Sequence, residues 1–446
     1  MTWRARILFT LLLLPAPAFA TPDIQHWNTS SGARVYFVEL RELPIVDVQV
    51  LFDAGSVRDP AGKKGIAMLT NSLLDEGAGG LDANTVSFDF EKLGAHFSSN
   101  TGDDSAGVSL RCLSDEKLLE PALANLQRVI TSPDFPGEAL ERQRNRLLIG
   151  IQQKMQSPGA IAADAFLEAI YASHPYAEPK EGTADTVKNI SRDDVTAFFK
   201  KYYTARNAAV AIVGDISRRR AERLAETLTG KLPRGEKLPP IPPVADLAAA
   251  SEIRKNFPST QTHAMIGQPG IKRGDPDFYA LYVGNQILGG NGLVSRLSQE
   301  IREKRGLTYS AYSYFSLRRE RGPFVAGFQT RAGQAPEALK VLRDTISKYI
   351  DDGPSKEELD EAKKNITGGF PMEIDSNSQI LGYVATIGYY GLPLNYLDTF
   401  VDRIKAVTAG DIKRAFQRHL NVNKFVTVLV GPADPAGPTV SRGEAH

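Results

Sequence analysis

Apolar and polar residues alternate in some segments of this chain and recur every three or four positions in others. Residues 46–52 alternate, which predicts a strand with one buried face. Ile66, Leu69 and Leu73 recur at helical spacing and predict an amphipathic helix over Gly65–Glu76. Longer helical patterns follow at Glu116–Ile130, Gly137–Gln156 and Ala160–Ala172. Strands mixed with helices, without a strict β–α–β alternation, predict an α+β fold built on mixed or antiparallel sheets packed with helices.

The second half of the chain repeats features of the first. Three landmarks recur at a constant separation of 217 positions: Asp194 and Asp411, Phe199 and Phe416, Gly214 and Gly431. In both copies Ser191 or Thr408 stands where a helix would begin, and a β-branched segment follows the helix. The sequence therefore predicts two similar, duplicated domains.

A proline-rich segment separates these two copies. Residues 231–251 contain five prolines and a run of small residues, so they cannot form a regular helix or a central strand. We interpret them as a semi-rigid linker. The predicted organisation is a first domain at residues 21–230, the linker, a second domain at 252–437 and a flexible tail at 438–446.

The first twenty residues have the pattern of a cleavable export signal. Arg4 and Arg6 precede a short apolar run, Ile7–Leu14, and the segment ends in Ala18-Phe19-Ala20. The alternative is a membrane anchor, but this apolar run is too short to cross a bilayer comfortably. No later segment is long and apolar enough to span. We therefore expect a signal peptide at 1–20 and a mature protein in a bacterial periplasm.

Composition excludes several kinds of function. The formal net charge is +1, so the chain has no general attraction to nucleic acid or to anionic membranes. Its single cysteine, Cys112, excludes an internal disulfide framework and a thiolate zinc cluster, and its strand-like surroundings favour a small core residue. The six histidines are scattered, and no two stand four residues apart. His174 lies in a loop-like segment.

Two motifs resemble those of a known enzyme family. Residues 54–67, Ala-Gly-Ser-Val-Arg-Asp-Pro-Ala-Gly-Lys-Lys-Gly-Ile-Ala, resemble the strand-to-helix segment of the M16 metallopeptidases, the pitrilysin or insulinase family. Ser295-Arg296-Leu297 and the segment Glu300–Ser310 resemble the C-terminal signature of the same family. The resemblance covers essentially the whole mature chain. It implies the two-domain bacterial branch, in which each chain forms half of a clamshell-like chamber.

The first motif lacks the family's zinc ligands. Active members carry His-x-x-Glu-His on the helix that follows this segment. The resemblance places those three positions at Met68, Asn71 and Ser72, none of which supplies an imidazole or a general base. The family's last ligand, a glutamate, would fall within Leu147–Ile151, which contains no carboxylate. We interpret the nearby Asp75 and Glu76 as a solvated helix end, and expect no catalytic zinc in this chain.

The second motif looks complete. The resemblance implies that Arg302 and Tyr309, seven residues apart, position substrate and stabilise charge on the scissile carbonyl across the chamber. Composition alone would place Arg302 in a solvated basic run and Tyr309 in a strand.

A glycine-rich segment, Gly289-Gly290-Asn291-Gly292, lies just before the second motif. It lacks the ending of a phosphate-binding loop and is typical of a tight turn. By resemblance to the glycine-rich loop of non-catalytic processing-peptidase subunits, Gly289, Gly290 and Gly292 are candidate substrate-binding residues. Tyr383, Tyr389 and Tyr390 are expected to be packing or chamber-lining residues.

These observations lead to a hypothesis of function. The chain would be the non-catalytic subunit of a heterodimeric periplasmic zinc endopeptidase, inactive alone. A zinc-bearing M16 partner would hold the metal, this chain would supply Arg302 and Tyr309, and unfolded peptides would be the substrates. Two alternatives stay open: an autonomous peptidase with an atypical metal site, and a purely structural or peptide-binding protein.

Overall fold

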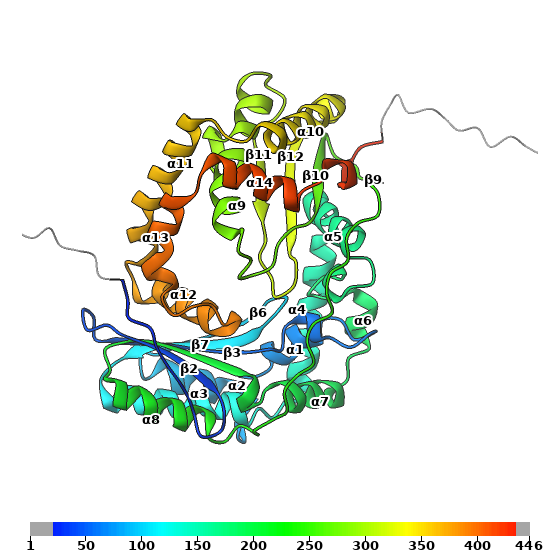
Figure 1. Cartoon of the computed structure of the whole chain (residues 1–446). Helices are drawn as coiled ribbons and strands as arrows, with labels where there is room; N and C mark the ends of the chain where they lie inside the picture. The colour runs from blue at the N-terminus through cyan, green and yellow to red at the C-terminus, as the bar shows by residue number, and fades with distance from the viewer. Residues whose placement is uncertain (1–20, 434–446) are drawn as a thin grey trace, which may run out of the picture.

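Two sheets, each covered by helices, form the frame of the molecule (Figure 1). The computed structural model describes residues 21–433, so the proposed signal peptide and the tail at 438–446 lie outside the described residues. The α+β architecture with two similar domains, predicted from the sequence, is confirmed. Within residues 21–433 no helix combines the length and apolarity that crossing a bilayer requires.

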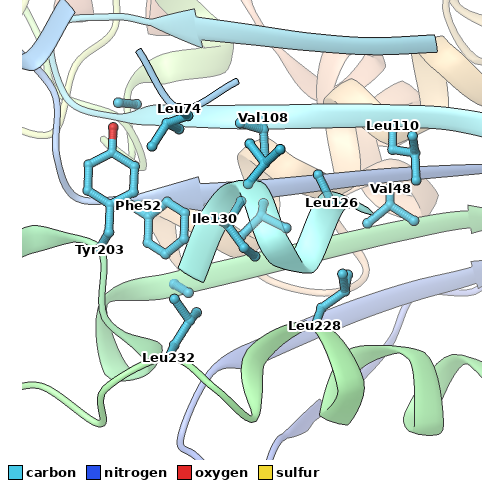
Figure 2. Close-up of a cluster of buried hydrophobic side chains, with 14 of the residues drawn as sticks. Val48, Phe52, Leu74, Val108, Leu110, Leu126, Ile130, Tyr203, Leu228 and Leu232 are labelled. Atoms are coloured by element: carbon cyan, nitrogen blue, oxygen red, sulfur yellow. The ribbon is translucent and has the colours of Figure 1, made fainter. Parts of the chain in front are cut away.

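The N-terminal sheet has six strands in the order β1-β2-β8-β3-β7-β6. Their bounds are β1 (Gln25–Asn28), β2 (Arg34–Glu39), β8 (Ala208–Gly214), β3 (Ile45–Phe52), β7 (Ala106–Leu113) and β6 (His96–Thr101). All neighbours are antiparallel except β2 and β8. Helices α3 (Glu116–Thr131) and α8 (Arg218–Thr229) bury their apolar faces on one side of the sheet, and Figure 2 shows Leu126, Ile130 and Leu228 meeting Val48 and Val108 there.

The C-terminal sheet repeats this topology. Its five strands run in the order β11-β12-β10-β13-β9, with β9 and β13 parallel and the other pairs antiparallel. Their bounds are β11 (Ala311–Phe315), β12 (Pro323–Arg331), β10 (Gln261–Pro269), β13 (Val426–Gly431) and β9 (Ser251–Asn256). Strand β9 begins 217 positions after β2, and helix α14 (Ala409–His419) begins 217 positions after α7 (Arg192–Tyr202). The offset found in the sequence therefore reappears in the structure at these elements, and β1 is the one strand of the N-terminal sheet without a counterpart among residues 251–433.

The remaining elements follow the same order in both halves. The N-terminal half adds α1 (Ile66–Ser72), α2 (Ala83–Glu91), α4 (Gly137–Lys154), α5 (Pro158–Tyr171), α6 (Ala184–Lys188) and the short pair β4 (Gly77–Ala78) and β5 (Leu81–Asp82). The C-terminal half adds α9 (Phe278–Asn285), α10 (Ala335–Asp352), α11 (Lys356–Gly369), α12 (Asn377–Tyr390) and α13 (Tyr396–Ala406). Two π-helical turns, Gln286–Gly290 and Ser298–Glu303, lie between α9 and β11.

Each half contributes one helix that packs on the sheet of the other half. Helix α5 packs on β10 and β13 of the C-terminal sheet, where Phe166 joins a cluster with Val428 and Val430. Helix α12, orange in Figure 1, packs on β8, β3 and β2 of the N-terminal sheet. Gly388 of α12 comes so close to the ring of Tyr36 that an added Cβ would lie 2.3 Å from it. Although α12 packs against the second face, β3 keeps the predicted alternation: Val46, Val48, Val50 and Phe52 are buried, whereas Ile45, Gln49 and Leu51 are only partly buried.

A hairpin loop fastens the C-terminal half to the N-terminal half. Arg318 and Arg319, between β11 and β12, pair with Asp103 at 2.9 Å and with Asp53 at 3.0 Å. The buried Asp104 accepts a hydrogen bond from the Arg319 backbone N–H at 2.7 Å and another from the Tyr390 hydroxyl at 2.8 Å. A network of buried charge and tyrosine hydroxyls therefore holds the two halves in one orientation.

The proline-rich segment lies against the body of the protein. Residues 231–250 contain no helix or strand, and Ser251 already begins β9. Ile241 and Val244 are buried beside α5, and the Pro239 carbonyl accepts a hydrogen bond from Arg58 at 2.9 Å.

Candidate functional site

Helix α1 carries the positions that the sequence resemblance assigns to the zinc motif, and a buried carboxylate fixes the start of this helix. Asp59 accepts hydrogen bonds from the backbone N–H groups of Gly65 at 2.8 Å and Ala67 at 3.1 Å. Burial raises the pKa of Asp59 to about 7, although these two bonds and Lys64 lower it. Gly65 has a φ of +93°, and an added Cβ would lie 2.6 Å from the Glu181 carbonyl oxygen. Glycine is therefore required at this position.

Asn71, at the position that the sequence resemblance assigns to the general base, has a hydrogen-bonded amide. Its Nδ2 donates to the carbonyl oxygens of Asn100 at 3.1 Å and Gly107 at 3.2 Å, and its Oδ1 accepts from the Tyr203 hydroxyl at 3.0 Å. The side chain is 1% exposed. Burial raises the pKa of Tyr203, which keeps its hydroxyl protonated as a donor. Asn71 is thus part of the core and has no atom left to bind a water or a metal.

The other ligand positions do not fit a zinc ion either. Met68 is half-buried and offers only a thioether, and the Ser72 hydroxyl donates to the Leu69 carbonyl at 3.0 Å. Leu147, Leu148 and Ile151 pack against the N-terminal core from α4. The donor set of the family's metal site is therefore absent from this chain.

The interpretation of Asp75 and Glu76 as a solvated helix end is wrong. Helix α1 ends at Ser72, and the Glu76 side chain is only 13% exposed. Glu76 pairs with Arg142 and accepts a hydrogen bond from Gln143, both on α4. Burial raises the pKa of Asp75. Glu76 therefore ties the segment after α1 to α4, an arrangement that local sequence does not reveal.

One group of potential metal ligands occurs among residues 21–433. Carboxylate oxygens of Asp275 and Asp277 and a ring nitrogen of His419 lie within 4.8 Å of one another. The Asp277 carboxylate already pairs with Arg418 at 2.6 Å and with His419 at 2.9 Å. A guanidinium bound to the same carboxylate opposes a cation there, so this group gives no support to an atypical metal site.

The arginine–tyrosine pair lies on exposed parts of the C-terminal half. Arg302 is on the second π-helical turn, its side chain is 33% exposed, and its one recorded ion pair is with the adjacent Glu303 at 3.6 Å. Tyr309 precedes β11 and is 77% exposed. Among the described residues, neither side chain forms a hydrogen bond or ion pair with α1. Leu293 and Val294, on a turn packed against that of Arg302, are also exposed.

The glycine-rich segment borders a large cavity. Gly289, Gly290 and Gly292 line a space of about 780 Å³, together with residues of α9, α12, α13 and β11. Gly289 lies against β11, where an added Cβ would be 2.4 Å from the Ser313 nitrogen, whereas a Cβ added at Gly292 would have nothing within 4 Å. Close packing against β11 explains why residue 289 is a glycine. The substrate-binding role of Gly289, Gly290 and Gly292 stays a prediction.

Of the three tyrosines expected to pack in the core or to line a chamber, one lines the cavity and two are packed. Tyr383 lines the cavity, whereas Tyr389 is buried and donates to the Asp104 carbonyl at 2.6 Å. Tyr390 donates to the Asp104 carboxylate, as described above. Cys112 is a buried free cysteine, as predicted.

Sequence reasoning missed two features of the site. Tyr203 is separated from Asn71 by 132 positions, and nothing in its local pattern points to that contact. The cavity brings together elements from α9 to α13, and the one available signal was the density of aromatic residues in that part of the chain.

Comparisons with known proteins agree with this geometry. Residues 34–184 match the family described as Insulinase (Peptidase family M16), and residues 189–366 match the Peptidase M16 inactive domain. A crystal structure of a peptidase M16 inactive domain from Pseudomonas fluorescens is 41% identical with a TM-score of 0.89, covering 93% of this chain and 99% of that one. The Non-peptidase homolog YmxG of Helicobacter pylori is 25% identical over 95% of this chain and 98% of its own. An uncharacterized zinc protease of Streptomyces coelicolor is 26% identical over 92% and 90% of the two chains.

Proposed function

Because the chain belongs to the peptidase M16 family, as an inactive-type member, we propose that it is the non-catalytic subunit of a heterodimeric zinc endopeptidase. In this proposal a partner M16 chain with the His-x-x-Glu-His motif holds the zinc. This chain supplies Arg302, Tyr309 and part of the wall around the peptide substrate.

The observation that carries the proposal is the contrast between the two motifs. Asn71 is buried with all of its polar groups bonded, whereas Tyr309 is 77% exposed and Arg302 pairs only with its neighbour. Side chains that serve only the fold of their own chain are usually packed or bonded within it. The exposed Tyr309 and the partly exposed Arg302, whose turn packs against that of the exposed Leu293 and Val294, are available to a second chain or a peptide.

Arg302 and Tyr309 have the right donors for a developing oxyanion. A guanidinium presents a planar fork of N–H groups, and a phenol presents one directed O–H. Zinc held by the partner would supply Lewis-acid chemistry. In the proposed complex Arg302 and Tyr309 position the scissile carbonyl and donate to its oxygen as negative charge grows there.

We also propose that the complex works in the periplasm on unfolded peptides. The basic and apolar pattern of residues 1–20 supports export.

The test is reconstitution with an M16 chain that carries the zinc motif. In the complex, Arg302→Ala should lower turnover of an unstructured peptide by about a hundredfold, the typical effect of removing one oxyanion donor. Tyr309→Phe should lower kcat in the same direction. Size-exclusion chromatography should show unchanged assembly.

Lys304→Ala is the matched control. Lys304 is two positions from Arg302, exposed, and paired at 2.5 Å with Glu300 of the same turn. This variant should keep wild-type turnover. An Arg302→Ala complex that assembles and turns over normally would contradict the assigned role.

A further inference from the structure

The cavity beside the glycine-rich segment is walled by aromatic rings. Phe278 and Tyr282 of α9 stack with their centroids 5.6 Å apart, and Tyr312 and Tyr314 of β11 stack at 6.0 Å. Tyr282 and Tyr314 are each 41% exposed. The remaining rings of the lining are Phe315, Tyr383, Tyr396 and Phe400. A space of about 780 Å³ with such walls has the size and character of a ligand site.

This cavity contains a single charged side chain, that of Arg273. Arg273 lies between β10 and α9, and its backbone N–H donates to the Arg318 carbonyl at 2.8 Å. Arg273 also lines three other cavities, of about 140, 300 and 680 Å³, and the last of these is polar, with Asp53, Glu236 and Arg319 in its wall. Arg273 therefore lies between the aromatic cavity and a polar one.

The Arg273 guanidinium lacks an anionic partner among the described residues. Its Nε is buried without a hydrogen-bond partner, and its guanidinium carbon lies 5.2 Å from the centroid of the Tyr390 ring. Two other partly buried arginines of this half have carboxylate partners: Arg296 pairs with Glu358 at 2.5 Å, and Arg319 pairs with Asp53 at 3.0 Å. A desolvated N–H without an acceptor is costly unless a ligand supplies one.

We propose that this cavity binds the C-terminal end of a peptide whose last residue has a large apolar or aromatic side chain. The terminal carboxylate binds Arg273, whose planar fork matches a carboxylate. The side chain packs among the rings. A single guanidinium balances one negative charge, which favours a carboxylate over a phosphate group. The inference rests on the proposed function only in that peptides are taken as the ligand class.

The test is equilibrium binding of fluorescent peptides to the isolated full chain. An unstructured peptide ending in phenylalanine with a free carboxylate should bind about tenfold to a hundredfold more tightly than its C-terminal amide. Arg273→Gln should remove this difference. Lys272→Gln, an exposed neighbour with the same loss of charge, should preserve it.

If Arg273→Gln does not fold, another variant, Tyr383→Ala, and further peptides still test the proposal. Tyr383→Ala should reduce the preference for a terminal phenylalanine over a terminal alanine. Equal binding of the acid and the amide would overturn the proposal. So would an amidated peptide with an internal aspartate that binds as tightly as the free acid, because the ligand would then be an acidic side chain.

Self-association abolished by Arg273→Gln would identify a second copy of the chain as the occupant, and would also overturn the proposal. The assay uses no partner and no turnover. Its failure is therefore distinguishable from failure of the proposed function, which is judged by turnover of the Arg302→Ala complex.

Discussion

The duplicated halves place equivalent helices in two very different environments. The 217-residue offset aligns α1 with residues 283–289, the end of α9 and the π-helical turn after it. Both segments contact the equivalent neighbours: α1 packs on α7 and β6, while α9 and its turn pack on α14 and β11. Around α1 the space is closed by Asn71 and Tyr203, whereas beside α9 a cavity of about 780 Å³ is open. The same scaffold can therefore seal one copy of a site and leave the other open for binding.

An asparagine joins helix to strand in both copies. Asn71 donates to the Asn100 carbonyl of β6, and Asn285 donates to the Ser313 carbonyl of β11 at 3.0 Å. In the N-terminal half the bonded amide stands where an active enzyme needs a carboxylate. The amide of Asn71 therefore belongs to a satisfied polar network in the core of the N-terminal half.

The largest effect on stability is expected from Asn71→Glu, which restores the carboxylate of the zinc motif. A buried glutamate would face the carbonyl oxygens of Asn100 and Gly107 without a cation, so we expect a loss of about 3–5 kcal/mol in the free energy of unfolding. Denaturant titration measures it. Asn71→Ala, which only leaves the Tyr203 hydroxyl and the two carbonyls unpaired, should cost about 1–3 kcal/mol. Wild-type stability of Asn71→Glu would show that the α1 region is not sealed.

The next effect concerns the cap of α1 and depends on pH. The pKa of Asp59 is about 7 in the folded protein against an ordinary value of 3.8, so the folded state holds the proton more tightly than the unfolded chain. The contribution of Asp59 to stability is therefore complete below about pH 4 and decreases as the pH rises to about 7. The stability difference between wild type and Asp59→Asn should follow this curve. A difference independent of pH from 4 to 7 would contradict the burial of a titrating carboxyl group.

Two glycines of the open half should respond unequally to alanine. Gly289→Ala forces a methyl group to within 2.4 Å of Ser313 and should cost about 1–3 kcal/mol, with weaker peptide binding. Gly292→Ala has free space around it and only the strain of a φ of +45°, about 1 kcal/mol. Thermal unfolding of the two variants in parallel measures the difference. Equal costs would mean that Gly289 can move away from β11.

The smallest effect on stability is expected at Arg302 and Tyr309, the two residues proposed to act on the substrate. Tyr309→Ala removes an exposed side chain, and Arg302→Ala removes a partly exposed one whose ion pair is with the adjacent Glu303, so each should change the free energy of unfolding by less than about 0.5 kcal/mol. Chemical denaturation of the isolated chain tests this. A loss above about 1 kcal/mol would mean that the pair serves the fold of its own chain.

Sequence patterns predicted the helices and strands of this fold better than they predicted which of these elements pack together. The helix predicted over Gly137–Gln156 forms as α4 at Gly137–Lys154, and the N-caps at Ser191 and Thr408 begin α7 and α14. These features depend on local chemistry. The exchange of α5 and α12 could not be predicted, because an amphipathic helix shows that it buries a face but not which sheet covers it.

In the candidate site, too, residue identities could be predicted from the sequence, whereas contacts between distant segments could not. The absence of zinc ligands follows from the identities of Met68, Asn71 and Ser72 alone. The bonds that hold Asn71 come from Tyr203 and from the backbone of two strands, and the cavity at Arg273 is assembled from four elements. Long-range assembly of this kind has no periodic signal in one sequence.

The packing of α12 on the N-terminal sheet also means that this sheet cannot be completely covered until most of the chain has been synthesised. The outer face of the N-terminal sheet is covered by α12, whose residues 377–390 are made more than 160 positions after β8 completes that sheet. A ribosome or an export channel that releases the chain from its N-terminus presents the sheet with one apolar face bare until α12 emerges. Chain truncations before residue 377 should therefore yield an N-terminal half that associates with chaperones or aggregates, instead of an independent folding unit.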